Sequence, residues 1–237
     1  MDHIVILTGA GISAESGMGT FRDKDGLWTK VSLEDVATPE GFARDPERVH
    51  EFYNERRAGC LRATPNAAHM ALARLQREHR GHITLVTQNV DSLHEAGGST
   101  DVIHMHGALL SALCSGCGYQ WPWTGNMSLG DVCADCGTTG TVRPDVVWFG
   151  EVPYHMDEIV AALEQATVFA AIGTSGNVYP AAGFVSEARR LAIPTVEINL
   201  ERTEATALFD HQIMGPATEA VPRFVDAVLS GSLTQTA

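Results

Sequence analysis

Short continuous runs of apolar residues recur along this chain, with room for a helix between most of them. They are rich in β-branched residues and alternate little with polar positions, a pattern typical of strands buried on both faces of a parallel sheet. We predict one sheet from six such runs, at residues 4–7, 83–86, 102–105, 146–149, 168–172 and 195–198.

Apolar residues at helical spacing lie between several of these runs. Thr64 and Pro65 make a good N-cap and first turn for a helix that continues to Leu75. A second helix is expected after Pro180, and a third closes the chain around residues 224–229. Strands that alternate with helices indicate an α/β fold with a Rossmann-like, doubly wound parallel sheet.

Two stretches do not fit this alternation. Residues 29–80 contain helical patterns but no convincing strand, and residues 109–142 are rich in Cys, Gly, Trp and Thr with poor periodicity. We interpret both as insertions that leave the sheet and together form a smaller domain. The large domain then comprises residues 1–28, 81–108 and 143–237.

Composition narrows the class of protein. With 237 residues, 44% of them hydrophobic and 19% charged, the chain has the composition of an ordinary globular protein. A formal net charge of −13 argues against a duplex nucleic-acid binder, which needs a basic face. No apolar run approaches the ~18 residues of a membrane span. The start MDHIVILTGAG has no basic region or cleavage site of a secretory signal, so we expect a cytoplasmic protein.

A glycine-rich turn follows the first predicted strand. Gly9, Gly11 and Ala14 fit the pattern G-x-G-x-x-G/A between a strand and a possible helix start. Such glycines let backbone N–H groups approach a pyrophosphate, although they can also serve a tight strand-to-helix turn alone. The acidic residue that usually follows about 20 residues later is missing. The pattern therefore indicates a dinucleotide site of an uncommon layout.

Two later turns are candidates to complete this site. Residues 173–175, Gly-Thr-Ser, follow the run at 168–172, and their N–H groups and hydroxyls can hold phosphate or ribose oxygens. The same residues are also compatible with a simple turn. Residues 199–201, Asn-Leu-Glu, follow the last predicted strand and are a candidate ribose contact.

Four of the five cysteines form two close pairs. Cys114 and Cys117, then Cys133 and Cys136, are each C-x-x-C, with 15 residues between the pairs. This spacing is typical of a zinc ribbon in which four thiolates close a tetrahedral shell, so the metal is structural. Redox pairs or free thiols are the alternative. Cys60 has no partner at such spacing and is expected in the core.

Polar residues follow two neighbouring predicted strands. Gln88, Asn89 and Asp91 come after the run at 83–86, and His106 comes after the run at 102–105. In an open α/β sheet ligands bind beyond the carboxyl ends of the strands, so these side chains should converge on the glycine turn. A histidine there is suited to act as a general base. Taken singly, each residue is equally compatible with a helix cap or a loop contact.

In chain order these motifs resemble the sirtuin family. They are GAGIS (9–13), FR (21–22), TQNVD (87–91), HG (106–107), the two C-x-x-C pairs, RPDVVWFGE (143–151), GTS (173–175) and INLE (198–201). The combination is very specific and spans most of the chain. It implies an NAD-dependent protein-lysine deacylase with a Rossmann-like NAD-binding domain and a small zinc domain.

The resemblance also implies roles for individual residues. His106 would act as general base on a ribose hydroxyl, Asn89 would be catalytic beside it, and the products would be free lysine, nicotinamide and an O-acyl-ADP-ribose. Residues implied to contact NAD are Gly9, Ala10, Gly11, Glu15, Thr20, Phe21, Arg22, Trp28, Gln88, Asn89, Asp91, Gly173, Thr174, Ser175, Asn199, Leu200, Glu201 and Ala217. Val147, Trp148 and Phe149 would form the channel for the lysine stem.

One pair of residues narrows the substrate class. Tyr53 and Arg56 share a face of a predicted helix and resemble the Tyr-x-x-Arg of class III sirtuins, which recognises a carboxylate on the acyl group. A guanidinium can bind a carboxylate through two hydrogen bonds, and a phenol adds a third. This implies succinyl-lysine or malonyl-lysine as substrate. Alternatively, Arg56 and Arg57 lie on a solvated helix face.

Other functions are compatible with parts of the pattern. A plain deacetylase or a mono-ADP-ribosyltransferase would use the same NAD site, and a non-catalytic zinc-ribbon protein could bind nucleic acid or act as a scaffold. Residues 109–142 contain no Lys or Arg, which argues against DNA binding. We expect acyl-lysine proteins as partners, no direct contact with nucleic acid or membrane, and a monomer.

Overall fold

Six parallel strands form the central sheet of the larger domain, in the order β3-β2-β1-β7-β8-β9. The computed structural model describes residues 2–19 and 32–232. Within them the sheet comprises β1 (His3–Thr8), β2 (His82–Thr87), β3 (Val102–His104), β7 (Val168–Ile172), β8 (Thr195–Asn199) and β9 (His211–Met214). The strand order reverses beside β1, as in a doubly wound sheet, and the predicted fold class is confirmed.

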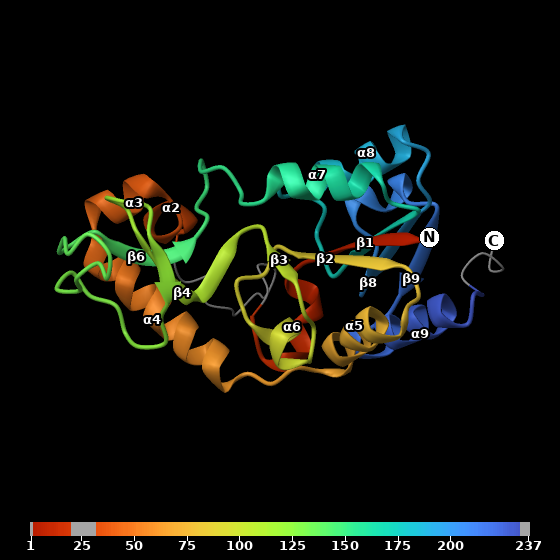
Figure 1. Cartoon of the computed structure of the whole chain (residues 1–237), viewed down its shortest axis with the longest axis horizontal. Coiled ribbons are helices and arrows are strands. Elements are labelled where there is room, and N and C mark those ends of the chain that lie inside the picture. The colour runs from red at the N-terminus through yellow and green to blue at the C-terminus, as the bar shows by residue number, and fades with distance from the viewer. Residues whose placement is uncertain (1, 20–31, 233–237) are drawn as a thin grey trace.

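Helices cover both faces of this sheet (Figure 1). On one face lie α5 (Ala67–Glu78) and α9 (Ala217–Leu229), with the short α6 (Leu93–Ala96) beside α5. Their apolar side chains, including Leu72 and Phe224, form a core with Ile6 and its neighbours. On the other face α7 (Met156–Glu164) and α8 (Phe184–Arg190) pack on Val5 and Leu7. The short 3-10 helices are η1 (Ala10–Ile12), η2 (Ala14–Ser16), η3 (Ala181–Gly183) and η4 (Glu204–Leu208).

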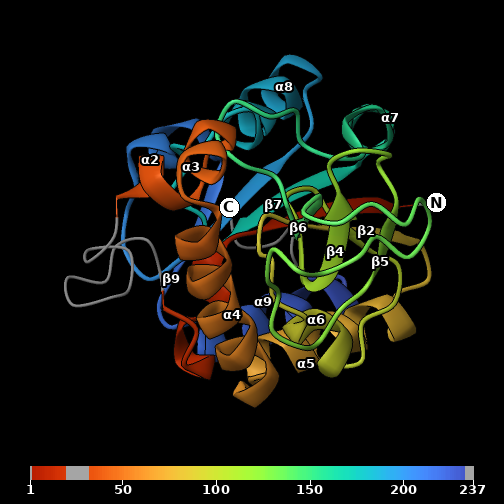
Figure 2. The same ribbon diagram turned by 90° about the vertical axis from the view of Figure 1, so that its left-hand side faces the viewer.

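The smaller domain lies beside the carboxyl ends of the parallel strands (Figure 1; Figure 2 views it end-on). It combines a helical part with a three-stranded antiparallel sheet in the order β5-β4-β6. Its elements are α2 (Leu33–Val36), α3 (Pro39–Arg44), α4 (Pro46–Arg62), β4 (Gly107–Cys114), β5 (Gln120–Pro122) and β6 (Val142–Val146). Val49 and Phe52 of α4, Leu109 of β4 and Trp148 share its main core.

Two elements differ from the sequence prediction. Residues 146–149 do not form a strand of the parallel sheet, because the strand there is β6, which ends at Val146 and pairs with β4. Their side chains are not all in a core: Val146 and Trp148 are buried, whereas Phe149 is 50% exposed. The edge strand β9, which is half-buried except at the exposed Gln212, was not predicted.

Helix α5 begins later than predicted. Its N-cap is Asn66, whose side chain accepts from Ala68 N–H at 2.9 Å, while the His69 ring accepts from the N–H of Asn66. Although α5 lies in the range 29–80, it packs on the large sheet rather than in the smaller domain. We therefore propose that the helical part of the smaller domain ends with α4. Among the described helices none is both long and apolar enough to cross a bilayer.

Candidate active site and metal centre

The turns after β1 and β7 pack directly against each other. The N–H of Gly9 donates to Ile172 O at 2.9 Å, and the N–H of Gly11 donates to Gly173 O at 2.8 Å. A Cβ on Gly11 would lie 2.7 Å from the Gly173 Cα, and Gly173 itself has a φ of +63°. The glycines are thus required by this close approach, and the amides of Gly9 and Gly11 are already used. Those of Ala10, Thr174 and Ser175 make no hydrogen bond within the described residues.

Side chains from two other strand ends fix the second turn. Gln88 Nε2 donates to Thr174 Oγ1 at 3.1 Å, and Asn199 Nδ2 donates to Thr174 O at 2.7 Å. Leu200 and Glu201, which follow Asn199, are exposed. Four segments therefore meet at the edge of the sheet where the sequence predicts a dinucleotide site. These segments are residues 9–11, 88, 173–175 and 199–201.

His106 lies between β3 and β4, where the chain passes from the large domain to the small one. Its Nδ1 is 3.1 Å from Gln88 O. Because a carbonyl only accepts, Nδ1 carries the proton and Nε2 is left as the basic nitrogen. Burial lowers the pKa of His106, and the bond to Gln88 O opposes this. The half-buried imidazole is therefore neutral near pH 7 and suited to accept a proton.

Gly107 allows the sharp turn after His106. It has a φ of +79°, and a Cβ there would lie 2.1 Å from Asp145 O. The neighbouring Val147 N–H donates to His106 O at 2.9 Å, which ties the catalytic candidate to the segment after β6.

Asn89 and Asp91 are buried beside the glycine turn. Asn89 Nδ2 donates to Ser13 Oγ at 3.1 Å, and the N–H of Leu93 donates to Asp91 Oδ1 at 3.1 Å. Burial raises the pKa of Asp91, opposed by the hydrogen bonds from Leu93 and Ser13. Ser13 thus joins two predicted site residues, a role that no pattern in the sequence indicates.

Two buried imidazoles lie next to these polar residues and contact Ser13 and Thr8. The rings of His69 on α5 and His94 on α6 are 5.1 Å apart. His69 Nε2 lies 3.3 Å from Ser13 Oγ, and His94 Nε2 lies 2.9 Å from Thr8 Oγ1. Burial lowers the pKa of His69 to about 4 and that of His94 to about 3, so both are neutral. Neither histidine belongs to a motif of the sequence, so these contacts were not predicted.

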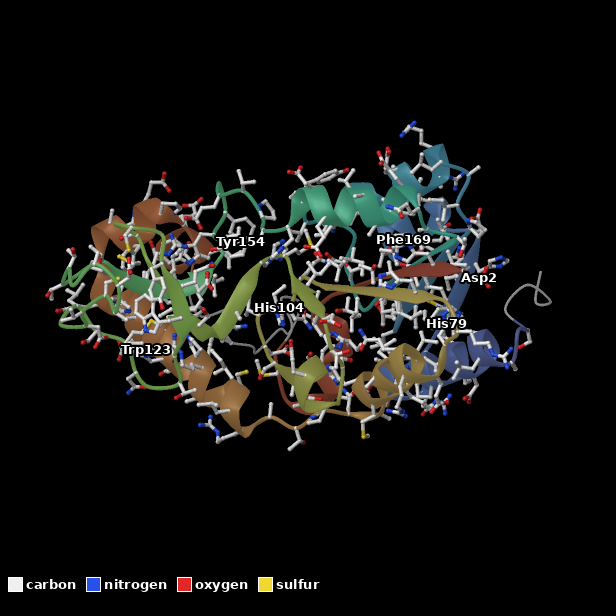
Figure 3. All side chains as sticks on the ribbon, in the orientation of Figure 1. Asp2, His79, His104, Trp123, Tyr154 and Phe169 are labelled. Atoms are coloured by element: carbon white, nitrogen blue, oxygen red, sulfur yellow. The ribbon has the colours of Figure 1, made fainter. Side chains whose placement is uncertain are left out.

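The His104 side chain contacts the backbone of Asn89, a predicted site residue. Figure 3 shows it at the junction of the two domains, two residues before the candidate base. Its Nδ1 lies 3.2 Å from Asn89 O and its Nε2 lies 2.7 Å from a Glu95 carboxylate oxygen. His104 therefore holds the main chain of Asn89.

Tyr53 and Arg56 lie one turn apart on α4, and Tyr53 faces Trp148. Tyr53 is 2% exposed, and Trp148 Nε1 donates to its hydroxyl at 3.0 Å. Arg56 is partly buried, and its charge is close enough to Tyr53 and Asp91 for both to raise its pKa against the effect of burial. The predicted pair is thus adjacent to the polar cluster rather than on the far side of the domain.

Arg57 does not lie on a solvated helix face. It is 1% exposed, and its guanidinium donates to Leu109 O and to Asn54 Oδ1, each at 2.8 Å. It joins α4 to β4 inside the smaller domain. The alternative that grouped Arg56 with Arg57 as solvated charges is therefore wrong for Arg57.

The remaining predicted site residues differ in their exposure and in their contacts. Val147 is half-buried and Phe149 exposed, as expected of a channel wall, whereas Trp148 is buried behind Tyr53. The Glu15 carboxylate accepts from Thr218 N and Oγ1 at 3.1 and 2.8 Å, so it caps the start of α9 next to Ala217. Four predicted cofactor contacts, Thr20, Phe21, Arg22 and Trp28, lie outside the described residues.

The four paired cysteines come together at one end of the small sheet. Their sulfur atoms all lie within 4.8 Å of one another. Cys114 Sγ is 3.8 Å from Cys136 Sγ, and Cys117 Sγ is 3.7 Å from Cys133 Sγ. Zinc bound tetrahedrally at about 2.3 Å requires sulfur–sulfur edges of about 3.8 Å, whereas a disulfide is about 2.05 Å long. The four thiols fit one structural Zn²⁺ with no open coordination position.

Comparison with known proteins agrees with this geometry. The chain matches the Sir2 family over residues 9–180 and belongs to that family, which confirms the sirtuin resemblance. An NAD-dependent protein deacylase of Caulobacter vibrioides is 55% identical over 230 residues, covering 96% of this chain and 97% of the relative. A protein of the same name from Escherichia coli (strain K12) is 54% identical, covering 97% of this chain and 83% of the relative.

Solved structures of the family share the fold. A Sir2 homologue in complex with NAD is 38% identical with a TM-score of 0.86, covering 97% of this chain and 90% of that one. A Sir2 protein with a deacetylated p53 peptide and 3′-O-acetyl ADP-ribose is 29% identical with a TM-score of 0.81, covering 97% and 93%.

Proposed function

We propose that this chain is an NAD-dependent protein-lysine deacylase that removes succinyl and malonyl groups and also acts on acetyl-lysine. The observation that carries this proposal is the arrangement of His106. Its Nδ1 faces a backbone carbonyl, its Nε2 makes no hydrogen bond within the described residues, and it lies where the strand ends converge. The Sir2 family membership and the deacylase names of relatives at 54–55% identity support it.

The residues present fit NAD. Asn89 and Asp91 are buried polar groups beside the glycine turn, suited to the ribose and carboxamide at the reactive end. The unused amides of Ala10, Thr174 and Ser175 suit the diphosphate, and Asn199 suits the adenosine half. When bound, NAD supplies the electrophilic sugar carbon and accepts the acyl group, giving nicotinamide and an O-acyl-ADP-ribose.

The chain's own part in the chemistry is proton transfer and positioning. His106 accepts a proton at Nε2 from a hydroxyl brought against it, and Gln88 O stabilises the imidazolium that results. Asn89 is held by Ser13, so its amide is fixed before a ligand arrives. Val147 and Phe149 line the approach of the lysine stem, and the half-exposed ring of Phe149 excludes water from it.

The preference for an acidic acyl group rests on Tyr53 and Arg56. The buried Tyr53 hydroxyl accepts from Trp148, and Arg56 supplies a positive charge one turn along the helix. A phenol and a guanidinium together match the oxygens of a carboxylate. Burial raises the pKa of Tyr53 to about 12, so it stays a hydrogen-bond donor at neutral pH.

The catalytic assignment is tested by His106→Ala. We expect deacylation of a succinyl-lysine peptide to fall at least about 100-fold, the usual contribution of a general base. Thermal stability and zinc content should stay as in the wild type, as in the control His82→Ala, which changes an exposed histidine on β2. Retained turnover in His106→Ala would remove this residue as the base.

The substrate class is tested by the ratio of kcat/KM for succinyl-lysine and acetyl-lysine peptides of one sequence. Arg56→Met should lower this ratio about tenfold or more, because a charge-assisted contact is lost. Arg62→Met, an exposed arginine at the end of α4, is the matched control. A wild-type enzyme without preference for succinyl-lysine, or an unchanged ratio in Arg56→Met, would make the chain a plain deacetylase.

Two further properties follow as proposals from the charge and the sequence pattern. The net charge of −13 favours basic protein segments over nucleic acid as partners. We further propose that the protein is cytoplasmic and monomeric. Size-exclusion chromatography with light scattering would test the oligomeric state.

The alternative activity is that of a mono-ADP-ribosyltransferase. Its readout is the transfer of ADP-ribose from labelled NAD to protein.

A further inference from the structure

Trp148 contacts Tyr53 from behind the predicted acyl pocket. It follows β6, is 2% exposed, and its ring packs on Phe42 and Tyr53 with centroids 5.3 and 6.4 Å away. Its Nε1 donates to the Tyr53 hydroxyl at 3.0 Å. Although it lies in the expected channel segment, its side chain is turned into the core of the smaller domain.

The direction of this hydrogen bond decides what Tyr53 can do. An indole N–H can only donate, so Trp148 occupies a lone pair of the phenol oxygen. The phenol proton must then point away from Trp148. Within residues 2–19 and 32–232 no acceptor for that proton is present. A buried hydroxyl with its proton directed this way is prepared to donate to a ligand oxygen, because a buried donor without a partner is costly.

Trp148 is itself fixed from two further directions. The guanidinium of Arg143 lies 3.4 Å from the centre of its ring. Arg143 also forms two hydrogen bonds with the Glu151 carboxylate, at 2.7 and 2.9 Å. The backbone N–H of Trp148 donates to the same carboxylate at 2.7 Å. Because Glu151 holds both the backbone of Trp148 and the cation over its ring, the indole has little freedom to turn.

We propose that Trp148 is a positioning residue for acyl selectivity: its indole N–H orients the Tyr53 hydroxyl to donate to the carboxylate at the end of a dicarboxylic acyl chain. This inference rests on the proposed function, in which Tyr53 and Arg56 bind that carboxylate. An acetyl group has no such acceptor, so Trp148 discriminates between the two substrates through Tyr53 alone.

The test is a double-mutant cycle on the ratio of kcat/KM for succinyl-lysine and acetyl-lysine peptides. Trp148→Phe removes the N–H but keeps an aromatic ring beside Arg143 and Phe42. We expect it to lower the ratio about five- to tenfold, mainly through the KM of the succinyl peptide, since the lost contact is made in the bound ground state. Tyr53→Phe should lower the ratio by at least as much.

The double variant distinguishes a role of Trp148 through Tyr53 from a general loss of packing. If Trp148 acts through the Tyr53 hydroxyl, adding Trp148→Phe to Tyr53→Phe leaves the ratio within about twofold of Tyr53→Phe alone. A general loss of packing would instead lower both activities together and change the ratio in neither background. Thermal unfolding of all four proteins, with Phe42→Leu as a packing control in the same core, separates loss of fold from loss of selectivity.

Two outcomes overturn the inference in different ways. If Tyr53→Phe lowers the ratio but Trp148→Phe does not, or if the two changes multiply, Trp148 has only a packing role and the carboxylate pocket stands. If Tyr53→Phe itself leaves the ratio unchanged, the carboxylate pocket fails, and the role of Trp148 fails with it.

Discussion

Asn54 and Met127 are joined by hydrogen bonds in both directions. Asn54 Nδ2 donates to Met127 O at 2.9 Å, and Asn54 Oδ1 accepts from Met127 N–H at 2.7 Å. Asn54 lies on α4 beside Tyr53, whereas Met127 lies in the loop that leads to the second cysteine pair. The helix that carries the proposed acyl-pocket residues is thereby fixed to the cysteine-rich module.

Removing this link should destabilise the smaller domain. Asn54→Ala leaves a backbone donor and acceptor of Met127 without their partner, at a cost of about 2 kcal/mol in the free energy of unfolding. Urea unfolding measures the change, with the exposed Asn126→Ala as control. Equal stability of the Asn54 and Asn126 variants would contradict this role.

The same link predicts an effect of zinc on substrate choice. We expect chelation of zinc to lower the selectivity for succinyl-lysine before it abolishes deacetylation.

The pH dependence of catalysis should follow the lowered pKa of His106. The base is active when neutral, so its activity is present above the folded pKa and lost as pH falls through it. Because burial lowers that pKa from its usual value of 6.5, the midpoint of the acid limb of kcat/KM should lie below pH 6.5, with a fall of about tenfold per pH unit beneath it. A profile of kcat/KM for a succinyl peptide checks this. An acid limb with its midpoint above pH 7 is the contrary result.

Acid should unfold the protein partly through His94. Its folded pKa is about 3, against an unfolded value near 6.5. Below pH 6.5 the unfolded chain binds a proton that the folded chain does not, so stability is lost as pH falls toward 3. Between pH 7 and 4.5 this contributes a loss of about 2–3 kcal/mol.

Urea unfolding of His94→Gln at both pH values isolates this contribution from other titrating groups. The wild type should lose more stability than the variant over this interval, by the amount given above. The exposed His82→Gln is the control. Parallel losses in wild type and His94→Gln would exclude His94 as the source.

The contact between the two glycine turns leaves no room for a side chain. In Gly11→Ala the new methyl group would lie 2.7 Å from Gly173 Cα and 2.8 Å from Gly173 O, both backbone atoms. We expect a loss of about 1–3 kcal/mol in stability together with weaker binding of NAD. Gly59→Ala, in α4 with open space around its Cβ, should instead be neutral or stabilising by about 0.5–1 kcal/mol. Thermal unfolding and calorimetric titration with NAD compare the two variants.

The sequence correctly predicted the elements in which the pattern of apolar residues matches their burial in the fold. Five of the six apolar runs are strands of the parallel sheet. Four of these strands are mostly buried, whereas β3 is half-buried at the edge. The run at 146–149 is not a strand of this sheet, because a channel wall and a small core use the same apolar residue types. The start of α5 was misplaced because Thr64, Pro65 and Asn66 are all acceptable near a helix start, and the contact of His69 with Asn66 selects the last.

The candidate site shows the same limit. The glycines, the cysteine spacing and His106 could be proposed from the sequence because their chemistry depends on local order along the chain. Ser13, His69 and His94 were missed because their roles depend on contacts between segments far apart in sequence. The hydrogen bond from Trp148 to Tyr53 joins residues 95 positions apart, which no local pattern indicates.

The packing of the Gly9–Gly11 turn on Gly173 has a consequence for synthesis of the chain. On the ribosome β1 is made before its neighbour β7, and both parts of the smaller domain are made between them. Until then the nascent chain exposes one edge of β1, whose residues 4–7 are all apolar. Nascent chains stalled before residue 168 should therefore bind chaperones, and those extended past β8 should be released from them.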